Sequence, residues 1–204
     1  MKRINSYTLF VLLLCALGQP AFLSPVVAQS VKTITILHTN DTHSRIEPVE
    51  INSPDKDLAD KGGYVRRATY INEVRRQIPN LLLFDCGDFS QGTPYYNLFK
   101  GEVEIRLMNT MGYDVGTIGN HEFDFGLDNM ARLFKMAKFP IVCANYDVKG
   151  TVLEGLVKPY VILNRNGLKI GVFGLGPKLE GLVQANKCEG IIYNDPILTA
   201  DKVA

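Results

Sequence analysis

Short apolar runs alternate along the chain with longer segments whose apolar positions recur every three or four residues. The short runs are rich in β-branched residues or wholly apolar, and they predict strands at 31–38, 81–85, 115–119 and 141–145. The helical spacing of the longer segments predicts helices at 62–78, 102–112 and 127–138. Residues that end helices stand at or just after these three segments, namely Pro79, Gly112 and Pro140. Strands that alternate with helices indicate an α/β layered domain.

A further apolar segment, residues 160–176, consists of two β-type runs on either side of Asn166-Gly167. Asn-Gly is favoured in two-residue turns that need positive φ at both positions, so this segment predicts a β-hairpin. Residues 49–63 are polar and without a period, and we expect a loop there. No internal repeat or low-complexity linker interrupts the order. The chain therefore predicts one domain after its first 28 residues.

Residues 1–28 have the pattern of a secretory signal peptide. Two basic residues precede an apolar run at 9–17, and small residues lead to a predicted cleavage after Ala28. The apolar run is about ten residues long, too short for a bilayer that needs roughly 20. An uncleaved N-terminal anchor is the alternative, whereas a lipoprotein at Cys15 is disfavoured because a leucine precedes it. The prediction is a secreted or periplasmic protein with no membrane span after cleavage.

Charge and cysteine content exclude two classes of protein. The chain has 22 basic and 21 acidic side chains, a net charge of +1, with no basic stripe, so we expect no nucleic-acid polymer as a partner. Three cysteines follow the predicted cleavage site, Cys86, Cys143 and Cys188, and this odd, widely spaced set is not a disulfide framework. Cys86 and Cys143 are expected to be buried thiols within strands.

Polar residues follow three successive predicted strands. Asp41 and His43 follow the first strand, and Asp88 follows the second. Asn120 and His121 follow the third. Because the carboxyl ends of parallel strands meet at one edge of the sheet, these side chains are expected to lie together, where open α/β sheets place their sites. Each cluster alone is explained by a turn or a capping role, but the three together indicate a metal site.

The ligand types indicate which ions would bind. Asp41 and His43, two residues apart, can direct an oxygen and a nitrogen at one ion, and the two oxygens of Asp88 can bridge two ions. Asn120 offers a neutral carbonyl oxygen. Mixed oxygen and imidazole ligation suits zinc, manganese or iron better than calcium. Two such ions, about 3.5–4 Å apart, can hold a phosphoryl group and lower the pKa of a bound water toward about 7.

His121 is a candidate catalytic residue rather than a ligand. Next to Asn120, its imidazole is expected to face the substrate, and Asp124 would orient it. Glu122 is expected to support neighbouring ligands or the fold. His38, inside the first predicted strand, is expected to be packed or hydrogen-bonded in the core.

Four segments carry a resemblance to a known family: "ILHTNDTHSRI", "LLLFDCGDFSQGTPYYNLFKG", "MNTMGYDVGTIGNHEFDFG" and "FPIVCANY". Together they resemble the calcineurin-like metallophosphoesterases. They resemble more closely the secreted 5'-nucleotidase branch, which includes UDP-sugar hydrolases and 2',3'-cyclic nucleotide phosphodiesterases. The resemblance covers about residues 31–200 and depends on Asp-x-His, Gly-Asp and Gly-Asn-His-Glu in this order. The fold it implies is the first part of a four-layer αββα sandwich, two sheets flanked by helices.

The resemblance also implies a role for each candidate residue. The implied metal ligands are Asp41, His43, Asp88 and Asn120. The implied catalytic pair is His121 and Asp124, with His121 stabilising the transition state or the leaving group. The implied cofactors are two divalent metal ions such as zinc or manganese, and the implied substrate is a nucleotide or another phosphoester.

The chain departs from the family pattern in two respects, since neither the later histidine motifs nor the C-terminal nucleotide-binding domain of this branch is found in residues 29–204. The family takes further histidine ligands from two later motifs, whereas this chain has no histidine after His121. We therefore expect residues 29–204 to be the N-terminal part of a metallophosphoesterase domain, which a complementing C-terminal chain would complete. The predicted function is hydrolysis of nucleotide phosphoesters by a metal-activated water. The alternative is a truncated, non-catalytic remnant, or half of a split enzyme, that binds metal or phosphate weakly.

Overall fold

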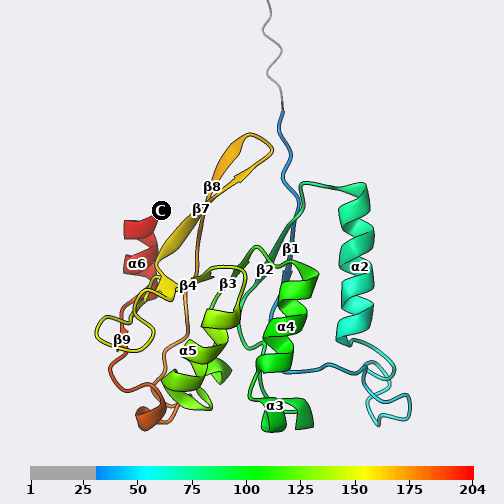
Figure 1. Ribbon diagram of the computed structural model, residues 1–204, viewed down its shortest axis with the longest axis horizontal. Coiled ribbons are helices and arrows are strands. Elements are labelled where there is room, and N and C mark those ends of the chain that lie inside the picture. Colours follow the sequence, from blue (N-terminus) through cyan, green and yellow to red (C-terminus); the bar gives the residue numbers. More distant parts are fainter. Residues whose placement is uncertain (1–30) are drawn as a thin grey trace, which may run out of the picture. The chain divides into compact units, whose positions relative to one another are not determined.

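A parallel β-sheet carries the loops that hold the candidate residues. The computed structural model describes residues 31–204, so the predicted signal peptide at 1–28 lies outside the described residues. Thr33–Ala204 form one unit. In spatial order the strands of the sheet are β1 (Ile36–Thr39), β2 (Leu82–Asp85), β3 (Val115–Gly116), β4 (Ile141–Val142) and β6 (Val157–Lys158). Every neighbouring pair is parallel, so all the carboxyl ends lie at one edge (Figure 1).

Helices connect most of these strands, as the crossovers of a parallel sheet require. The α-helices are α2 (Tyr64–Gln77), α3 (Pro94–Phe99), α4 (Glu102–Met111), α5 (Gly126–Met136) and α6 (Pro196–Val203). The two 3-10 helices are η1 (His121–Phe123) and η2 (Ala185–Lys187). The three predicted helices are confirmed as α2, α4 and α5. Within residues 31–204, no helix has the length and the apolar run needed to cross a bilayer.

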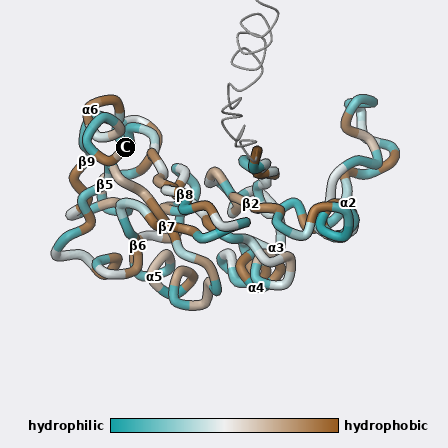
Figure 2. Tube along the Cα trace, turned by 90° about the horizontal axis from the view of Figure 1, so that it is seen from above, coloured by the Kyte–Doolittle hydropathy of each residue, from teal (hydrophilic) through white to brown (hydrophobic). Residues whose placement is uncertain are grey.

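The core lies between the helices and one face of the sheet. Figure 2 shows α4 and α5 on the same side of the strands. Buried side chains of this core come from the helices and from the strands, and include Ile71, Leu83, Ile105, Met108, Met130, Leu133 and Ile141. Each large apolar side chain buried in this way stabilises the fold by about 1.5–3 kcal/mol. The strand ends, and the loops that leave them, are therefore anchored by a packed layer.

Two smaller sheets complete the described fold. β7 (Tyr160–Arg165) and β8 (Leu168–Phe173) pair antiparallel, and the turn between them has φ of 51° at Asn166 and 69° at Gly167. The hairpin predicted from Asn-Gly is therefore confirmed. β5 (Tyr146–Asp147) pairs antiparallel with β9 (Ile192–Tyr193). Residues 172–175 lie over the second face of the parallel sheet, with a cavity of about 230 Å³ between them and residues such as Phe84 and Val142.

Some predicted bounds were wrong. The first strand begins at Ile36 rather than at residue 31. The strand predicted at 141–145 ends at Val142 as β4, and the separate β5 begins only after this segment, at Tyr146. The sequence pattern also missed α3, β6 and β9. β6 and β9 are two residues long, and a two-residue strand has no detectable alternation.

The expected burial of His38 and Cys86 was also wrong, because both are exposed. Leu37 packs against the core, so its neighbour His38 projects from the opposite face of edge strand β1. His38 pairs with Phe84, and Cys86 follows Phe84 by two residues onto that same face. The helices do not cover this face. Cys143, in contrast, is buried as predicted.

Candidate metal centre

The loops that follow β1 and β2 are joined by backbone hydrogen bonds. The amides of Asp41, His43 and Ser44 donate to the carbonyls of Gly87, Asp88 and Phe89, each at 3.0 Å. The two loops therefore run beside each other beyond the ends of their strands. This pairing brings the first and second predicted clusters together.

Four residues of these two loops have left-handed backbone conformations, which L-amino acids with a side chain seldom adopt. Their φ angles are 49° at Asp41, 40° at His43, 49° at Ser44 and 53° at Asp88. Such strain costs on the order of 1–3 kcal/mol per residue and is concentrated at functional sites in proteins. Three of the four are residues that the sequence singles out as metal ligands.

The third loop, after β3, approaches the Asp88 loop at two glycines. A Cβ atom on Gly87 would lie 2.5 Å from the amide nitrogen of Gly119. A Cβ atom on Gly119 would lie 2.7 Å from the amide nitrogen of Asp88 and would overlap its carboxylate. Only residues without a side chain allow the loops to approach this closely. The approach places Asn120 and His121 beside Asp88.

The imidazole of His43 faces two carboxylates without bonding to either. Its Nε2 atom lies 3.7 Å from Asp41 Oδ1 and 3.8 Å from Asp88 Oδ2. The same atom is buried and has no hydrogen-bond partner among the described residues. Two ligands at about 2.0–2.2 Å from one ion can be up to about 4.2 Å apart. His43 Nε2 is therefore at a spacing from each carboxylate that a shared divalent cation allows, and such a cation would satisfy the otherwise unpaired nitrogen. Asp41 is not one of the described donors that lie within 4.8 Å of one another, so this carboxylate stands further from the Asp88 side of the group.

His121 joins the same group of donors. His43, Asp88 and His121 each offer a ligand atom, and these atoms lie within 4.8 Å of one another. The two imidazole rings meet edge to face, with their centroids 5.2 Å apart. Asn120, half-buried, immediately precedes His121 in this loop. All the candidate ligands thus come from the three loops at one edge of the sheet.

The position of His121 is set by two further contacts. Its backbone amide donates to Asp88 Oδ1 at 2.8 Å, and its Nδ1 atom lies 3.0 Å from Asp124 Oδ2. Both side chains of the His121–Asp124 pair remain partly accessible, at 25% and 38%. The pairing expected from the sequence is therefore present, at the start of η1 and just after it.

Two buried carboxylates lie behind the candidate ligands. Glu122 accepts hydrogen bonds from the amides of Asp88 and Gly119, and burial, aided by the Asp88 charge, raises its pKa to about 8. Asp85 accepts from Thr39 Oγ1 at 2.6 Å and from the Gly87 amide at 3.1 Å, and burial raises its pKa to about 6. No spacing in the sequence distinguished Asp85 as a buried group. Only the packing around both carboxylates reveals their contacts.

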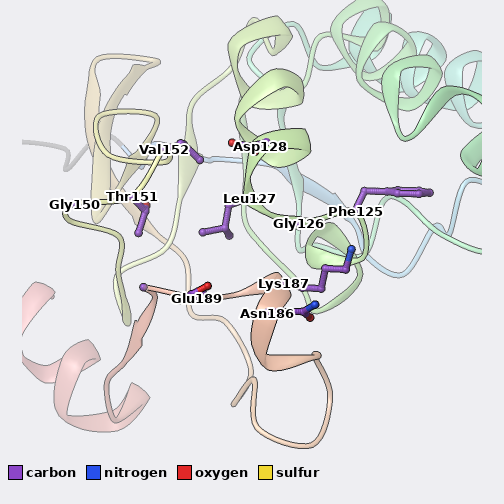
Figure 3. A pocket seen from close by; sticks show the side chains of 11 residues that line it. Phe125, Gly126, Leu127, Asp128, Gly150, Thr151, Val152, Asn186, Lys187 and Glu189 are labelled. Atoms are coloured by element: carbon purple, nitrogen blue, oxygen red, sulfur yellow. The ribbon is translucent and has the colours of Figure 1, made fainter.

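Open space adjoins the Asp124 side of the site. A cavity of about 520 Å³ lies between the first turn of α5 and residues 150–152 and 186–190. Figure 3 shows Leu127, Lys187 and Glu189 around this space. Lys187 also lines a smaller cavity, of about 250 Å³, that Asp124 borders. The smaller cavity therefore lies beside Asp124, whereas His121 lines neither of the two cavities.

The family model for calcineurin-like phosphoesterases matches residues 34–188. The chain belongs to the calcineurin-like phosphoesterase family. Among curated proteins, a snake venom 5'-nucleotidase of Gloydius brevicauda is 42% identical over 176 residues, which are 84% of this chain and 30% of that protein. A human 5'-nucleotidase is 39% identical over 191 residues, which are 91% of this chain and 32% of that protein.

A solved structure of a 5'-nucleotidase precursor from Thermus thermophilus is similar to this chain, with a TM-score of 0.74 and 34% identity. The match covers 83% of this chain and 33% of that one. The chain thus spans about a third of the length of the relatives it matches. The α/β fold with a parallel sheet, predicted from the sequence, is confirmed and corresponds to the N-terminal portion of these proteins.

Proposed function

We propose that this chain supplies the metal-binding loops of a phosphoester hydrolase that acts on nucleotides, in the manner of a 5'-nucleotidase. One observation carries the proposal: His43 Nε2 is buried, has no hydrogen-bond partner within residues 31–204, and faces the carboxylates of Asp41 and Asp88. Membership of the phosphoesterase family and the similarity to 5'-nucleotidases support the substrate class.

The proposed centre holds two divalent ions, zinc or manganese, with ligands from all three loops. The proposed ligands are Asp41, His43, Asp88 and Asn120. When bound, such ions lower the pKa of a water to generate the nucleophile and neutralise charge on the phosphoryl group. All three histidines of the chain lie at or before position 121, so any further imidazole ligand would come from another segment or a partner chain.

His121 and Asp124 are the proposed catalytic pair. With its proton on Nδ1 and donated to Asp124, the imidazole of His121 would present Nε2 to the phosphoryl group or to the leaving oxygen. Asp88 would hold this loop in place through the bond from the His121 amide to its Oδ1 atom. The space beside Asp124 would admit part of the substrate.

The leader at 1–28 supports a secreted or periplasmic location, where extracellular nucleotides would be the substrates. This location would be tested by sequencing the N-terminus of the protein from its native cells. A mature chain that begins at Gln29 is the expected result. A protein that keeps Met1 would contradict cleavage.

The test of function uses two histidine variants in the protein expressed from its complete reading frame. We expect the wild type to bind Mn²⁺ in calorimetry and to release phosphate from AMP. His43→Ala should lose both, by more than 100-fold in rate, since it removes a ligand rather than a more remote support. His38→Ala is the matched control, because His38 is exposed on the same segment, and it should leave both unchanged. Equal behaviour of the two variants would refute the proposed metal centre, and Mn²⁺ binding without phosphate release would indicate a non-catalytic binding protein.

A further inference from the structure

The carboxylate of Glu122 joins the Asp88 loop to the loop that carries Asn120 and His121. Its Oε2 atom accepts from the amides of Gly119 at 2.7 Å and Asp88 at 2.9 Å. Its Oε1 atom accepts from the hydroxyl of Ser90 at 3.2 Å and from the Ser90 amide at 3.4 Å. Glu122 is only 1% exposed, so water does not compete for these contacts.

The bonds between the two loops are reciprocal. Glu122, on the third loop, accepts from the backbone of Asp88, and the Asp88 side chain accepts from the backbone of His121 at 2.8 Å. The second bond uses Asp88 Oδ1, which leaves Oδ2 facing His43 Nε2. The rotation of the Asp88 carboxylate, and hence the oxygen it presents to a cation, is therefore fixed by this pair of contacts.

The contacts around Glu122 favour a side chain with two accepting oxygens over an amide. Each hydrogen bond that reaches its side chain comes from an N–H or O–H donor. A glutamine in the same place would direct its own N–H₂ group at donors, since one end of an amide cannot accept. Within residues 31–204, Glu122 forms no ion pair, so a cation near Asp88 would be the nearest compensating charge.

We propose that Glu122 is a positioning residue of the metal centre. Its carboxylate holds the left-handed backbone of Asp88 and the amide of Gly119 in place, and so sets the geometry in which Asp88 and Asn120 meet the cation. This inference rests on the proposed function, because it concerns the same site. It assigns Glu122 no contact with the substrate or with the ion.

The test compares Mn²⁺ affinity and stability in the protein expressed from its complete reading frame. Glu122→Gln keeps the size of the side chain, and we expect it to lower Mn²⁺ affinity by about 10–100-fold while the protein still unfolds cooperatively. Asn145→Ala is the control for loss of a buried polar group elsewhere, since Asn145 is fully buried and bonds to Gly176. It should lose stability but keep its Mn²⁺ affinity.

The outcomes separate this inference from the proposed function. A wild type that neither binds Mn²⁺ nor releases phosphate from AMP would refute the proposed function itself. A wild type that does both, with Glu122→Gln within two-fold of it in affinity, would overturn the positioning role alone. Equal losses of Mn²⁺ affinity in Glu122→Gln and Asn145→Ala would show that general destabilisation lowers the affinity. That result would also overturn the positioning role.

Two measurements keep the inference testable if Glu122→Gln does not fold. Ser90→Ala removes the hydroxyl that lies 3.2 Å from Glu122 Oε1 and 3.5 Å from the His121 carbonyl oxygen, and it leaves the amide contacts of Glu122 in place. We expect Mn²⁺ affinity to fall several-fold, as for the loss of one hydrogen bond. Hydrogen exchange of the wild type should show slow exchange at the amides of Asp88 and Gly119. Unchanged affinity in Ser90→Ala, together with fast exchange at both amides, would refute the positioning role.

Discussion

The Nδ1 atom of His121 lies 3.0 Å from Asp124 Oδ2, across the single turn of η1. The i,i+3 spacing brings the two side chains to one face of this turn, at the edge of the sheet where the three loops meet. The short helix therefore brings Asp124 to the imidazole, while Asp88 Oδ1, from the neighbouring loop, holds the backbone amide of His121. This contact leads directly to a test of the proposed catalytic pair.

Loss of the Asp124 carboxylate should lower turnover more than substrate binding. Asp124→Asn is expected to reduce kcat for AMP by about 10–100-fold, because the imidazole loses the acceptor that sets its tautomer and orientation. His121→Ala should cost about 10²–10⁴-fold, the usual contribution of a general acid or base. Asp201→Asn is the control, because Asp201 is an exposed aspartate of α6 that lines neither cavity near Asp124. Steady-state kinetics would contradict the pairing if Asp124→Asn matched this control.

The close approach of the Asp88 and Asn120 loops can be tested with two glycines, of which only one lies against the other loop. Gly87 and Gly92 both have positive φ, 95° and 84°, but a Cβ atom would meet Gly119 only at position 87. Gly92→Ala should cost about 1–3 kcal/mol in unfolding free energy from backbone strain alone.

Gly87→Ala should cost roughly 1–3 kcal/mol more than Gly92→Ala, since overlap is added to the strain, and it should also weaken Mn²⁺ binding. Denaturant unfolding and calorimetry measure the two effects. If both variants lost the same stability, and both kept their affinity for Mn²⁺, the close approach of the loops would contribute neither to stability nor to metal binding.

Burial of Asp85 should make stability depend on pH. Its pKa is raised from 3.8 to about 6, so between these values the folded state holds a proton that the unfolded state has released. Unfolding free energy should therefore fall as pH rises from about 4 to about 6, by at most about 3 kcal/mol, and this contribution should be constant above that range. Burial also raises the pKa of Glu122 from 4.5 to about 8, so this group should lower the unfolding free energy further as pH rises to about 8.

The Asp85 contribution is isolated by the difference between the wild type and Asp85→Asn. In metal-free buffer with a chelator, the variant should lack the Asp85 part of the slope between pH 4 and 6. The absolute stability of the variant is less informative, because an amide can accept only one of the two hydrogen bonds from Thr39 and Gly87. Parallel pH profiles of the two proteins would contradict a raised pKa at Asp85.

Asn145 should be important for stability but not for metal binding. Its side chain donates to the Gly176 carbonyl at 2.9 Å and accepts from the Gly176 amide at 2.7 Å, fully buried. Asn145→Ala leaves two buried backbone groups unpaired and should cost about 2–5 kcal/mol. Asn194→Ala removes one long bond of 3.5 Å and should cost less than about 1 kcal/mol. Similar unfolding midpoints for the two variants would show that the Gly176 contacts are not needed.

The order of elements and the identity of the candidate residues follow from the sequence alone. The spacing of apolar residues predicted α2, α4, α5 and the strands beside them. A helix that faces the core repeats its apolar residues every three or four positions, whereas a strand covered on both faces is apolar throughout. Asn166-Gly167 determined the hairpin through its preference for positive φ. The Asp-x-His, Gly-Asp and Gly-Asn-His-Glu motifs were sufficient to identify the family. They also supplied the candidate ligands, since ligand chemistry depends on residue type.

Burial and contact were decided only by the tertiary structure. His38 and Cys86 follow a strand pattern, but they lie on a sheet face that none of the described helices covers. A sequence pattern does not say which faces are covered. Glu122 and Asp124 are both acidic and two residues apart. Glu122 turns inward to the amides of Asp88 and Gly119, whereas Asp124 stays at the surface beside His121. Such differences arise from contacts between loops more than 30 positions apart, which local spacing cannot encode.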